Sequence, residues 1–296
     1  MSEGERFAEV GRGIVLCYDE TGDAGARPLL LVAGLGQQLH SWPQGFARAL
    51  AERGFRVVRF DNRDVGRSTH LDFRPPSVLA MLAGRIPAVQ YHLGDLARDT
   101  AGLLAALEVP AAHVVGASMG GMIAQTLAAH HPDRVLTLTS IMSTTGARGT
   151  GRPAASTWRR LLAKPPTTRQ AAMDAAANMF RHIGSHAFPF DEEAVRAIAG
   201  EAWDRDPTTV GVTRQLAAIV ASGDRTAELR SITAPTLVVH GDRDRMVHPS
   251  GATATARAIP GARLVTIPGM GHDLPEGAWP RLVELITEHA TTAAAS

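Results

Sequence analysis

The sequence predicts an α/β fold built on a mostly parallel, eight-stranded sheet that is flanked by helices. Short apolar or branched runs alternate with helical patterns in two separate blocks of the chain. Most of these runs end at Gly, Asp or Ser, which is typical of buried strands that lead into turns. Such alternation implies right-handed βαβ units with helices on both faces of the sheet.

The first block begins with a hairpin and then alternates strands with helices. "FAEV" and "IVLCY" flank the turn signal "GRG", which predicts two antiparallel strands. Four further strands are predicted at 29–34, 55–61, 113–118 and 136–142. Helices are predicted between them at 42–53, 93–107 and 119–131, and Pro132 stops the last one.

The second block supplies the last two strands, and a helical segment separates it from the first. The strands are predicted at 234–241 and 262–269, with helices at 251–259 and 279–289. Between the blocks the alternation stops, and helical patterns run at 170–182, 191–203 and 210–222. The ends of this segment re-enter the same α/β pattern. We therefore expect one core of residues 1–142 and 231–296, and a helical cap inserted at 143–230.

Composition excludes several classes of partner and site. The 296 residues carry a net charge of +1 with acids and bases interleaved, so we expect neither nucleic acid nor an anionic membrane as a partner. One cysteine allows no internal disulfide and no Cys/His metal site of usual spacing. The first twenty residues lack an apolar signal region, and no stretch reaches the roughly 18 apolar residues of a membrane span. These features predict a soluble, cytoplasmic chain.

Residues 116–120 form a GxSxG motif, "GASMG", around Ser118. Chance produces about 0.1 such matches in a chain of this composition, so the motif alone is weak. Its context is stronger, because "HVVG" reads as a strand and "MIAQTLAAH" as a helix, which is the strand, turn and helix of a nucleophile elbow. Ser118 is therefore a candidate nucleophile. Met119 would open the helix, with its backbone N–H facing negative charge that develops beside Ser118.

Candidate partners for Ser118 follow three other predicted strands. Asp242 and Asp244 come after one strand, His272 after the next, and Leu35 follows the strand at 29–34. The carboxyl ends of parallel strands share one edge of the sheet, so these loops should meet there. Either aspartate could orient His272, and the backbone N–H of Leu35 could be the second oxyanion donor beside that of Met119.

These motifs resemble those of the α/β-hydrolase superfamily serine esterases. The similarity covers essentially the whole chain: "GASMGG" at the elbow, GxxD from Gly241, "GMGH" before Asp273, and "FDNRDVGRST" after the second parallel strand. Within the superfamily the chain is most similar to actinobacterial carboxylesterases, often labelled lipases, and more loosely to aclacinomycin methylesterases. The family's GxxD pattern implies that Asp244 is the triad acid and that Asp242 stabilises the turn. One departure is that Ala33 stands where the family often has the histidine of an HG pair, which leaves the support of the oxyanion loop unexplained.

The expected reaction is the hydrolysis of a small-molecule carboxylic ester. His272, held by Asp244, would deprotonate Ser118, an acyl-enzyme would form, and water would release the acid, with no metal or cofactor required. A cofactor-free perhydrolase, a thioesterase and an amidase share every one of these residues, and a non-catalytic small-molecule receptor is a further alternative. Asp61, Arg63 and Asp64 either border the site or satisfy the end of a strand. The aromatic and methionine side chains of the insertion either pack its helices or line a pocket: Trp158, Met173, Met179, Phe180, Phe188, Phe190 and Trp203.

Overall fold

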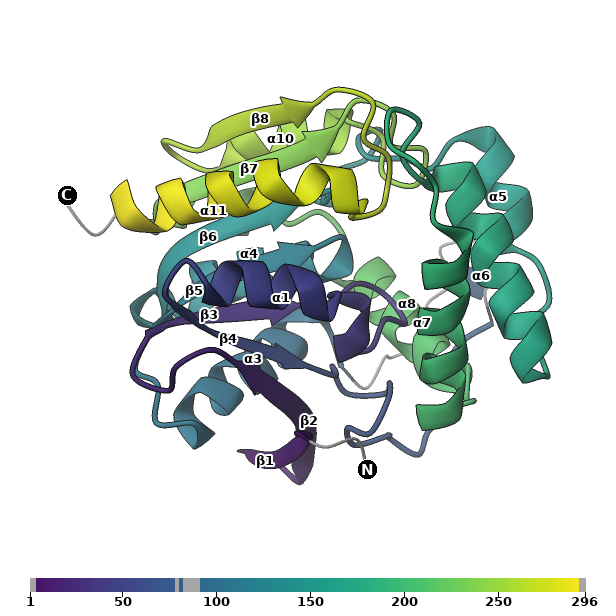
Figure 1. Cartoon of the computed structure of the whole chain (residues 1–296), viewed down its shortest axis with the longest axis horizontal. Helices are drawn as coiled ribbons and strands as arrows, with labels where there is room; N and C mark the ends of the chain where they lie inside the picture. The colour runs from purple at the N-terminus through teal and green to yellow at the C-terminus, as the bar shows by residue number, and fades with distance from the viewer. Residues whose placement is uncertain (1–3, 78–79, 82–90, 293–296) are drawn as a thin grey trace.

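A computed structural model describes residues 4–77, 80–81 and 91–292 (Figure 1). Its eight strands form one sheet in the order β1-β2-β4-β3-β5-β6-β7-β8. The hairpin strands β1 and β2 pair antiparallel, β2 pairs antiparallel with β4, and every pair from β4 to β8 is parallel. The predicted fold class is confirmed. The strands are β1 (Arg6–Gly11), β2 (Ile14–Thr21), β3 (Arg27–Val32), β4 (Phe55–Phe60), β5 (Ala112–Ala117), β6 (Val135–Ile141), β7 (Thr236–Gly241) and β8 (Arg263–Ile267).

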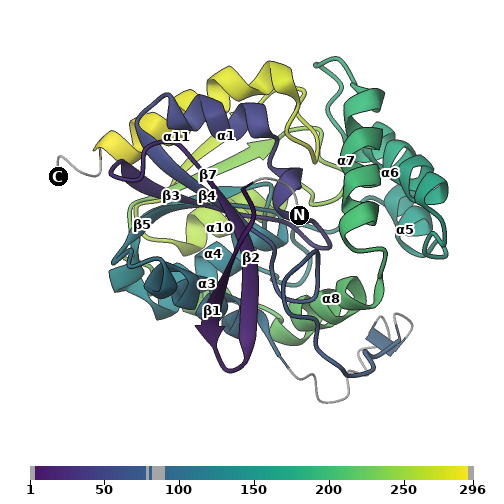
Figure 2. The ribbon, with the colours of Figure 1, turned by 60° about the horizontal axis from the view of Figure 1, so that its bottom comes forward.

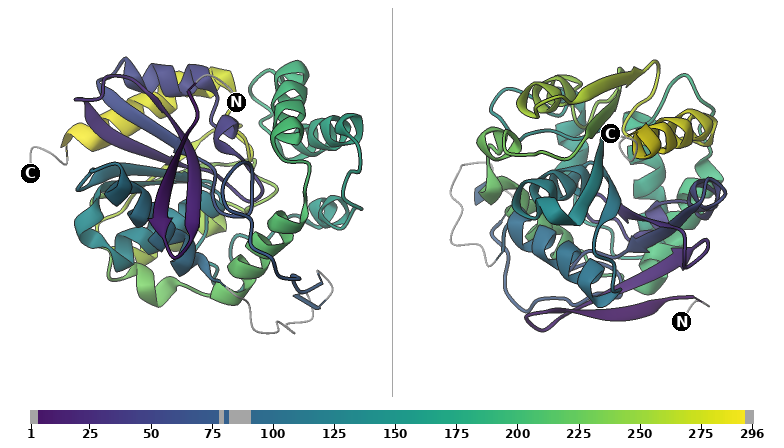
Figure 3. Two further views of the ribbon diagram at one scale, coloured as in Figure 1. Left: turned by 90° about the horizontal axis from the view of Figure 1, so that it is seen from below. Right: turned by 90° about the vertical axis from the view of Figure 1, so that its left-hand side faces the viewer.

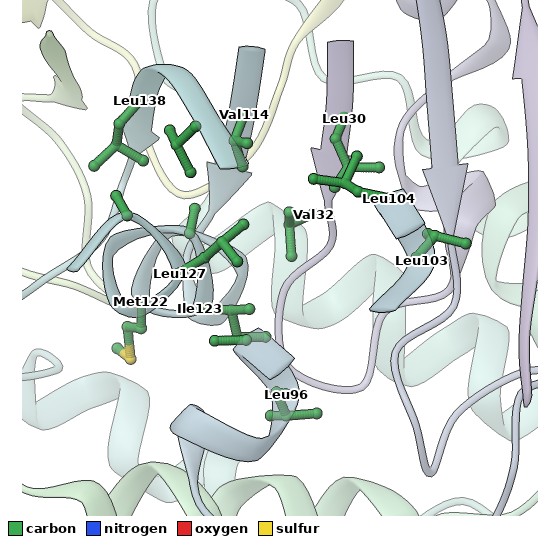
Figure 4. Packing of buried hydrophobic residues seen from close by; sticks show 14 of the residues in the cluster. Leu30, Val32, Leu96, Leu103, Leu104, Val114, Met122, Ile123, Leu127 and Leu138 are labelled. Carbon is green, nitrogen blue, oxygen red and sulfur yellow. The ribbon is translucent and has the colours of Figure 1, made fainter. Parts of the chain in front are cut away.

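Helices cover both faces of this sheet and bury two apolar clusters. On one face lie α1 (Gln44–Ala51) and α11 (Trp279–Thr292), which pack on the side chains that the central strands direct to that face. On the other face lie α3 (Leu93–Ala106), α4 (Met119–His130) and α10 (Ser250–Ala258). Figure 4 shows the second cluster, where Leu127 of α4 lies on the side toward Val114 and Leu138 of the strands and Ile123 lies near Leu96 of α3. Burial on both faces explains why the central strands are apolar runs rather than alternating patterns.

Five helices lie between β6 and β7. They are α5 (Ala155–Leu161), α6 (Arg169–Ile183), α7 (Glu192–Arg205), α8 (Val210–Ser222) and α9 (Thr226–Leu229). Helices α5, α6 and α7 stand beyond the carboxyl ends of the strands, on the right of Figure 1, and the view turned by 60° in Figure 2 shows α8 below them. The view from below, on the left of Figure 3, shows that α5, α6 and α7 stand apart from the helices that flank the sheet. The insertion therefore overhangs the edge of the sheet at which the candidate residues gather.

Two of these helices were absent from the prediction. Helix α5 has seven residues and α9 has four, which is too short for a helical period to stand out. Helix α5 also begins two residues after Pro153, in a stretch that contains three glycines. Elsewhere the predicted elements exist, and their ends shift by a few residues. Among the described helices, none combines the length and apolar character that crossing a membrane requires.

Candidate active site

Ser118 sits at the sharp junction between β5 and α4. Its backbone has φ +57° and ψ −120°, a conformation that residues other than glycine rarely adopt. Its N–H donates to the carbonyl of Ile141 at 2.9 Å, and its own carbonyl accepts the hydroxyl of Ser143 at 2.8 Å. The neighbouring strand β6 and the residues that follow it thus hold the turn in its strained form.

The two glycines of the GxSxG motif are required by close backbone contacts. A Cβ atom on Gly116 would lie 2.1 Å from the carbonyl oxygen of Gly120. A Cβ atom on Gly120 would lie 2.0 Å from the carbonyl oxygen of Val32 in β3. Both distances are far inside van der Waals contact, so only glycine lets α4 start this close to the strands.

The structure brings Ser118, His272 and Asp244 together. The Oγ atom of Ser118 lies 3.0 Å from Nε2 of His272, and Nδ1 of His272 lies 2.7 Å from Oδ2 of Asp244. These three side chains come from loops after β5, β8 and β7, and they meet at the carboxyl edge of the sheet. His272 and Asp244 are buried, whereas Ser118 is partly exposed. The arrangement can pass a proton from the serine to a histidine whose orientation the carboxylate holds.

The Asp244 carboxylate is held from both of its oxygens. Oδ1 accepts the backbone N–H groups of Met246 and Val247, each at 2.8 Å. Oδ2 faces His272 and also lies 3.2 Å from Nε2 of His240 on β7. Burial alone would raise the pKa of Asp244, but the charge of His272 and the hydrogen bonds of both histidines lower it well below its usual range. The Asp244 carboxylate is therefore ionised in the folded protein at neutral pH.

Asp242 lies elsewhere, although it is only two residues away. Its Oδ1 accepts the backbone N–H of Gly269 at 2.6 Å, which ties the end of β7 to the loop after β8. Its side chain is 42% exposed, whereas that of Asp244 is fully buried. The structure thus places Asp244, and not Asp242, against His272.

Two backbone N–H groups next to Ser118 have no hydrogen-bond acceptor within the described residues. One belongs to Met119, the first residue of α4, and the other to Leu35, in the turn after β3. This turn reaches the serine, because a Cβ atom on Gly34 would lie 3.4 Å from the Cβ atom of Ser118. Free donors at a helix N-terminus and in an adjacent turn can stabilise an oxyanion that forms on a carbonyl attacked by Ser118.

The inserted segment holds the histidine loop. The backbone N–H of His272 donates to the carbonyl of Ile183 at the end of α6, at 2.8 Å. Next to it, the Asp273 carboxylate accepts the N–H and the hydroxyl of Ser185, at 2.9 and 2.5 Å. Burial raises the pKa of Asp273, and these two hydrogen bonds oppose the rise. Nothing in the sequence signalled Ile183 or Ser185, since both lie some 90 residues before the histidine.

The loop after β4 is also tied to the insertion, by buried ion pairs. Asp61 pairs with Arg205 at the end of α7 at 2.7 Å, and Asp64 pairs with Arg214 of α8 at 2.9 Å. All four side chains are at least nine-tenths buried. Arg63 instead forms a buried pair with Asp99 of α3. Of the two readings of Asp61 and Asp64, hydrogen bonding inside the fold describes them better, because Asp61 also accepts the N–H of Leu39.

A cavity of about 250 Å³ opens between the Leu35 turn and helices α6 and α7. It starts at Gly36 and Gln37, and it includes neither Ser118 nor His272. Phe180 and Trp203 line it, as do several alanines and Val212. Trp158 does not line it; this residue lies on α5 with 38% of its surface exposed.

Comparison with known proteins settles the family. The family model described as the alpha/beta hydrolase fold matches residues 27–277, most of the chain. The chain belongs to this α/β-hydrolase family. The match agrees with the fold, the resemblance and the enzyme class predicted from the sequence, a carboxylic ester hydrolase.

Two curated relatives of this α/β-hydrolase resemble it over nearly their full lengths. Rhodomycin D methylesterase DauP of Streptomyces sp. (strain C5) is 32% identical, and rhodomycin D methylesterase DnrP of Streptomyces peucetius is 31% identical. Each alignment covers 95% of this chain and 96% of the relative. Among solved structures, a hydrolase from Pseudomonas aeruginosa PA01 is similar over 100% of both chains, with a TM-score of 0.71 and 27% identity.

Proposed function

We propose that the protein is a serine esterase that works through Ser118, His272 and Asp244. The observation that carries the proposal is the unbroken chain of short contacts from Oγ of Ser118 through the imidazole of His272 to the Asp244 carboxylate, at 3.0 and 2.7 Å. In this mechanism His272 removes the proton of Ser118 as its oxygen attacks the ester carbonyl. The N–H groups of Leu35 and Met119 stabilise the resulting oxyanion.

Collapse of the tetrahedral intermediate completes the first half of the reaction. The C–O bond to the alcohol breaks, His272 gives its proton to the departing oxygen, and Ser118 keeps the acyl group. His272 then takes a proton from the water that attacks the acyl-enzyme, and it gives this proton to the Ser118 oxygen as the acyl C–O bond breaks and the acid leaves. Every group this cycle uses belongs to the chain or to water.

We further propose that residues 143–230 act as a cap and that the ester has a small alcohol. The methylesterase names of the two relatives support a methyl ester. The cavity beside the Leu35 turn supports an acyl group that extends beneath α6 and α7. A panel of esters with graded acyl lengths, each as its methyl and its butyl ester, tests this. Turnover should be faster for the methyl member of each pair.

The mechanism is tested by Ser118→Ala. We expect this variant to lose ester hydrolysis, labelling by a serine-directed fluorophosphonate, and the acyl-enzyme visible by mass spectrometry. Ser222→Ala is the matched control, because the Ser222 hydroxyl, at the end of α8, bonds the backbone groups of Leu93 and Ala218 and not Ser118 or His272. Labelling that persists in Ser118→Ala would refute the assignment of the nucleophile.

A further inference from the structure

Gln215 joins the insertion to the turn after β3 and to the loop after β4. It lies on α8 and is fully buried. Its Oε1 accepts the backbone N–H of Gly36 at 2.9 Å, and its Nε2 donates to the backbone carbonyl of Arg63 at 2.8 Å. Both polar atoms of this buried side-chain amide form hydrogen bonds with backbone groups. These bonds hold the two backbone groups in place, because breaking either one would leave a buried polar atom unpaired.

The bond to Gly36 falls inside the turn that carries the Leu35 N–H. The N–H of Gln37 donates to the carbonyl of Gly34 at 3.1 Å, which closes a four-residue turn. Gly36 has φ +67°, whereas Leu35 does not have a positive φ, so the turn is of type II. Types I and II differ in the orientation of the central peptide, here the one between Leu35 and Gly36. Gln215 accepts the N–H of that peptide and so favours the type II form.

Other contacts bind the same turn to the insertion. Nε2 of Gln38 donates to the carbonyl of Ala202 on α7 at 2.9 Å, and its Oε1 accepts from Arg205. Val212 of α8 packs against Gly36, where a Cβ atom would lie 3.0 Å from both of its methyl groups. Ala33, which stands where the family often has a histidine, has no side chain that could hold this loop by a hydrogen bond. Contacts with α7 and α8 hold the loop instead.

We propose that Gln215 is a positioning residue for the oxyanion donor at Leu35. It does not touch Ser118 or His272. It holds the Leu35–Gly36 peptide so that the preceding N–H of Leu35 stays directed at the oxyanion, and it couples that geometry to the docking of α8. This inference rests on the proposed function, since it assigns a role within that reaction.

The test compares Gln215→Met, which loses both hydrogen bonds at similar volume, with Gln215→Glu, which keeps an acceptor for Gly36. Gln125→Met is the matched control, because Gln125 is a fully buried glutamine on α4 that bonds Ser140 and Arg225 instead. The readouts are kcat and KM for 4-nitrophenyl acetate, and the inhibition constant of an alkyl trifluoromethyl ketone. The ketone's adduct with Ser118 places an oxyanion between the two donors.

We expect Gln215→Met to lower kcat by about 10- to 100-fold, with KM changed less than threefold, because a displaced oxyanion donor acts mainly in the transition state. The inhibition constant of the ketone should rise in proportion to the loss of kcat/KM. Gln215→Glu should keep more of the wild-type kcat than Gln215→Met does, and Gln125→Met should stay within threefold of wild type.

An unchanged kcat in Gln215→Met would overturn the inference, and so would a rise in KM alone. A fall in kcat without weaker ketone binding would also overturn it, because general loss of structure would then explain the effect. Wild-type protein separates this inference from the proposed function. If the wild type neither hydrolyses esters nor is labelled at Ser118, the proposed function fails, whereas an active wild type with an active Gln215→Met refutes the positioning role alone.

Discussion

Asp244 lies 2.7 Å from Nδ1 of His272, whereas Asp242, two residues earlier, bonds the backbone of Gly269. The separation follows from the turn after β7, where the N–H groups of Met246 and Val247 fold back onto Asp244. Two carboxylates that are near neighbours in sequence thus have different partners and different exposure.

Exchanging each carboxylate for an amide should separate their roles. Asp244→Asn should lower kcat by about 10⁴-fold, because an amide favours the wrong tautomer of His272 and no longer stabilises its protonated form. Asp242→Asn should lower kcat less than threefold, since its carbonyl can still accept the Gly269 N–H. Steady-state kinetics on one ester measures both variants. The reverse ranking would contradict the assignment of Asp244.

The strained backbone at Ser118 predicts an unusual stability ranking. Ser118→Gly should be more stable than Ser118→Ala by about 1 to 2 kcal/mol, because glycine tolerates φ +57° and alanine keeps the strain. Both variants should be inactive. Urea unfolding of the two proteins gives the difference directly. Equal stabilities would mean that the turn stores no strain.

The buried ion pair between Arg205 and Asp61 should matter far more than an exposed pair. Arg205→Met should destabilise the protein by about 3 to 5 kcal/mol, because it removes the buried guanidinium that pairs with both Asp61 and Glu5. Arg169→Met removes the pair with Asp204, whose side chains are 49% and 58% exposed, and should cost less than about 1 kcal/mol. Thermal and urea unfolding compare them. Similar losses in the two variants would argue against a special role for the buried pair.

His113 should make stability fall on mild acidification. It is buried on β5 with Nδ1 2.9 Å from the hydroxyl of Thr137, and burial lowers its pKa from 6.5 to about 4. The folded protein therefore binds this proton less readily than the unfolded chain, so its stability contribution is present above pH 6.5 and is lost as the pH falls toward 4.

Between about pH 7.5 and about pH 5, the loss from this one group should be about 2 kcal/mol. His113→Asn keeps a polar group near Thr137, but asparagine does not titrate. Between the same two pH values, the free energy of unfolding of this variant should therefore fall by about 2 kcal/mol less than that of the wild type. Urea unfolding at each pH measures the difference. Parallel pH profiles for wild type and variant would show that His113 is not responsible.

The sequence predicted much of the fold and of the candidate site because their signals are local. Glycines at 116 and 120, the strand before them and the helix after them all lie within about twenty residues. The same holds for the loops that carry Leu35, Asp244 and His272, each of which follows a short apolar run. In α8, the polar residues Arg214 and Gln215 interrupt an otherwise apolar face, which is a weaker sign of a buried polar contact. The pattern alone does not show which groups these two side chains contact.

By itself, the sequence determined the types and order of the strands and of the described helices of eight or more residues, and the position of each candidate site residue after a strand. Periodicity and turn chemistry act over a few residues, so a single chain displays them. The tertiary structure decided which aspartate meets His272, and it decided that Gln215 holds Gly36 across 179 residues of chain. It also paired Asp61 with Arg205 across 144 residues. Those contacts depend on how the inserted helices pack over the edge of the sheet, and packing between distant segments leaves no periodic trace in either one.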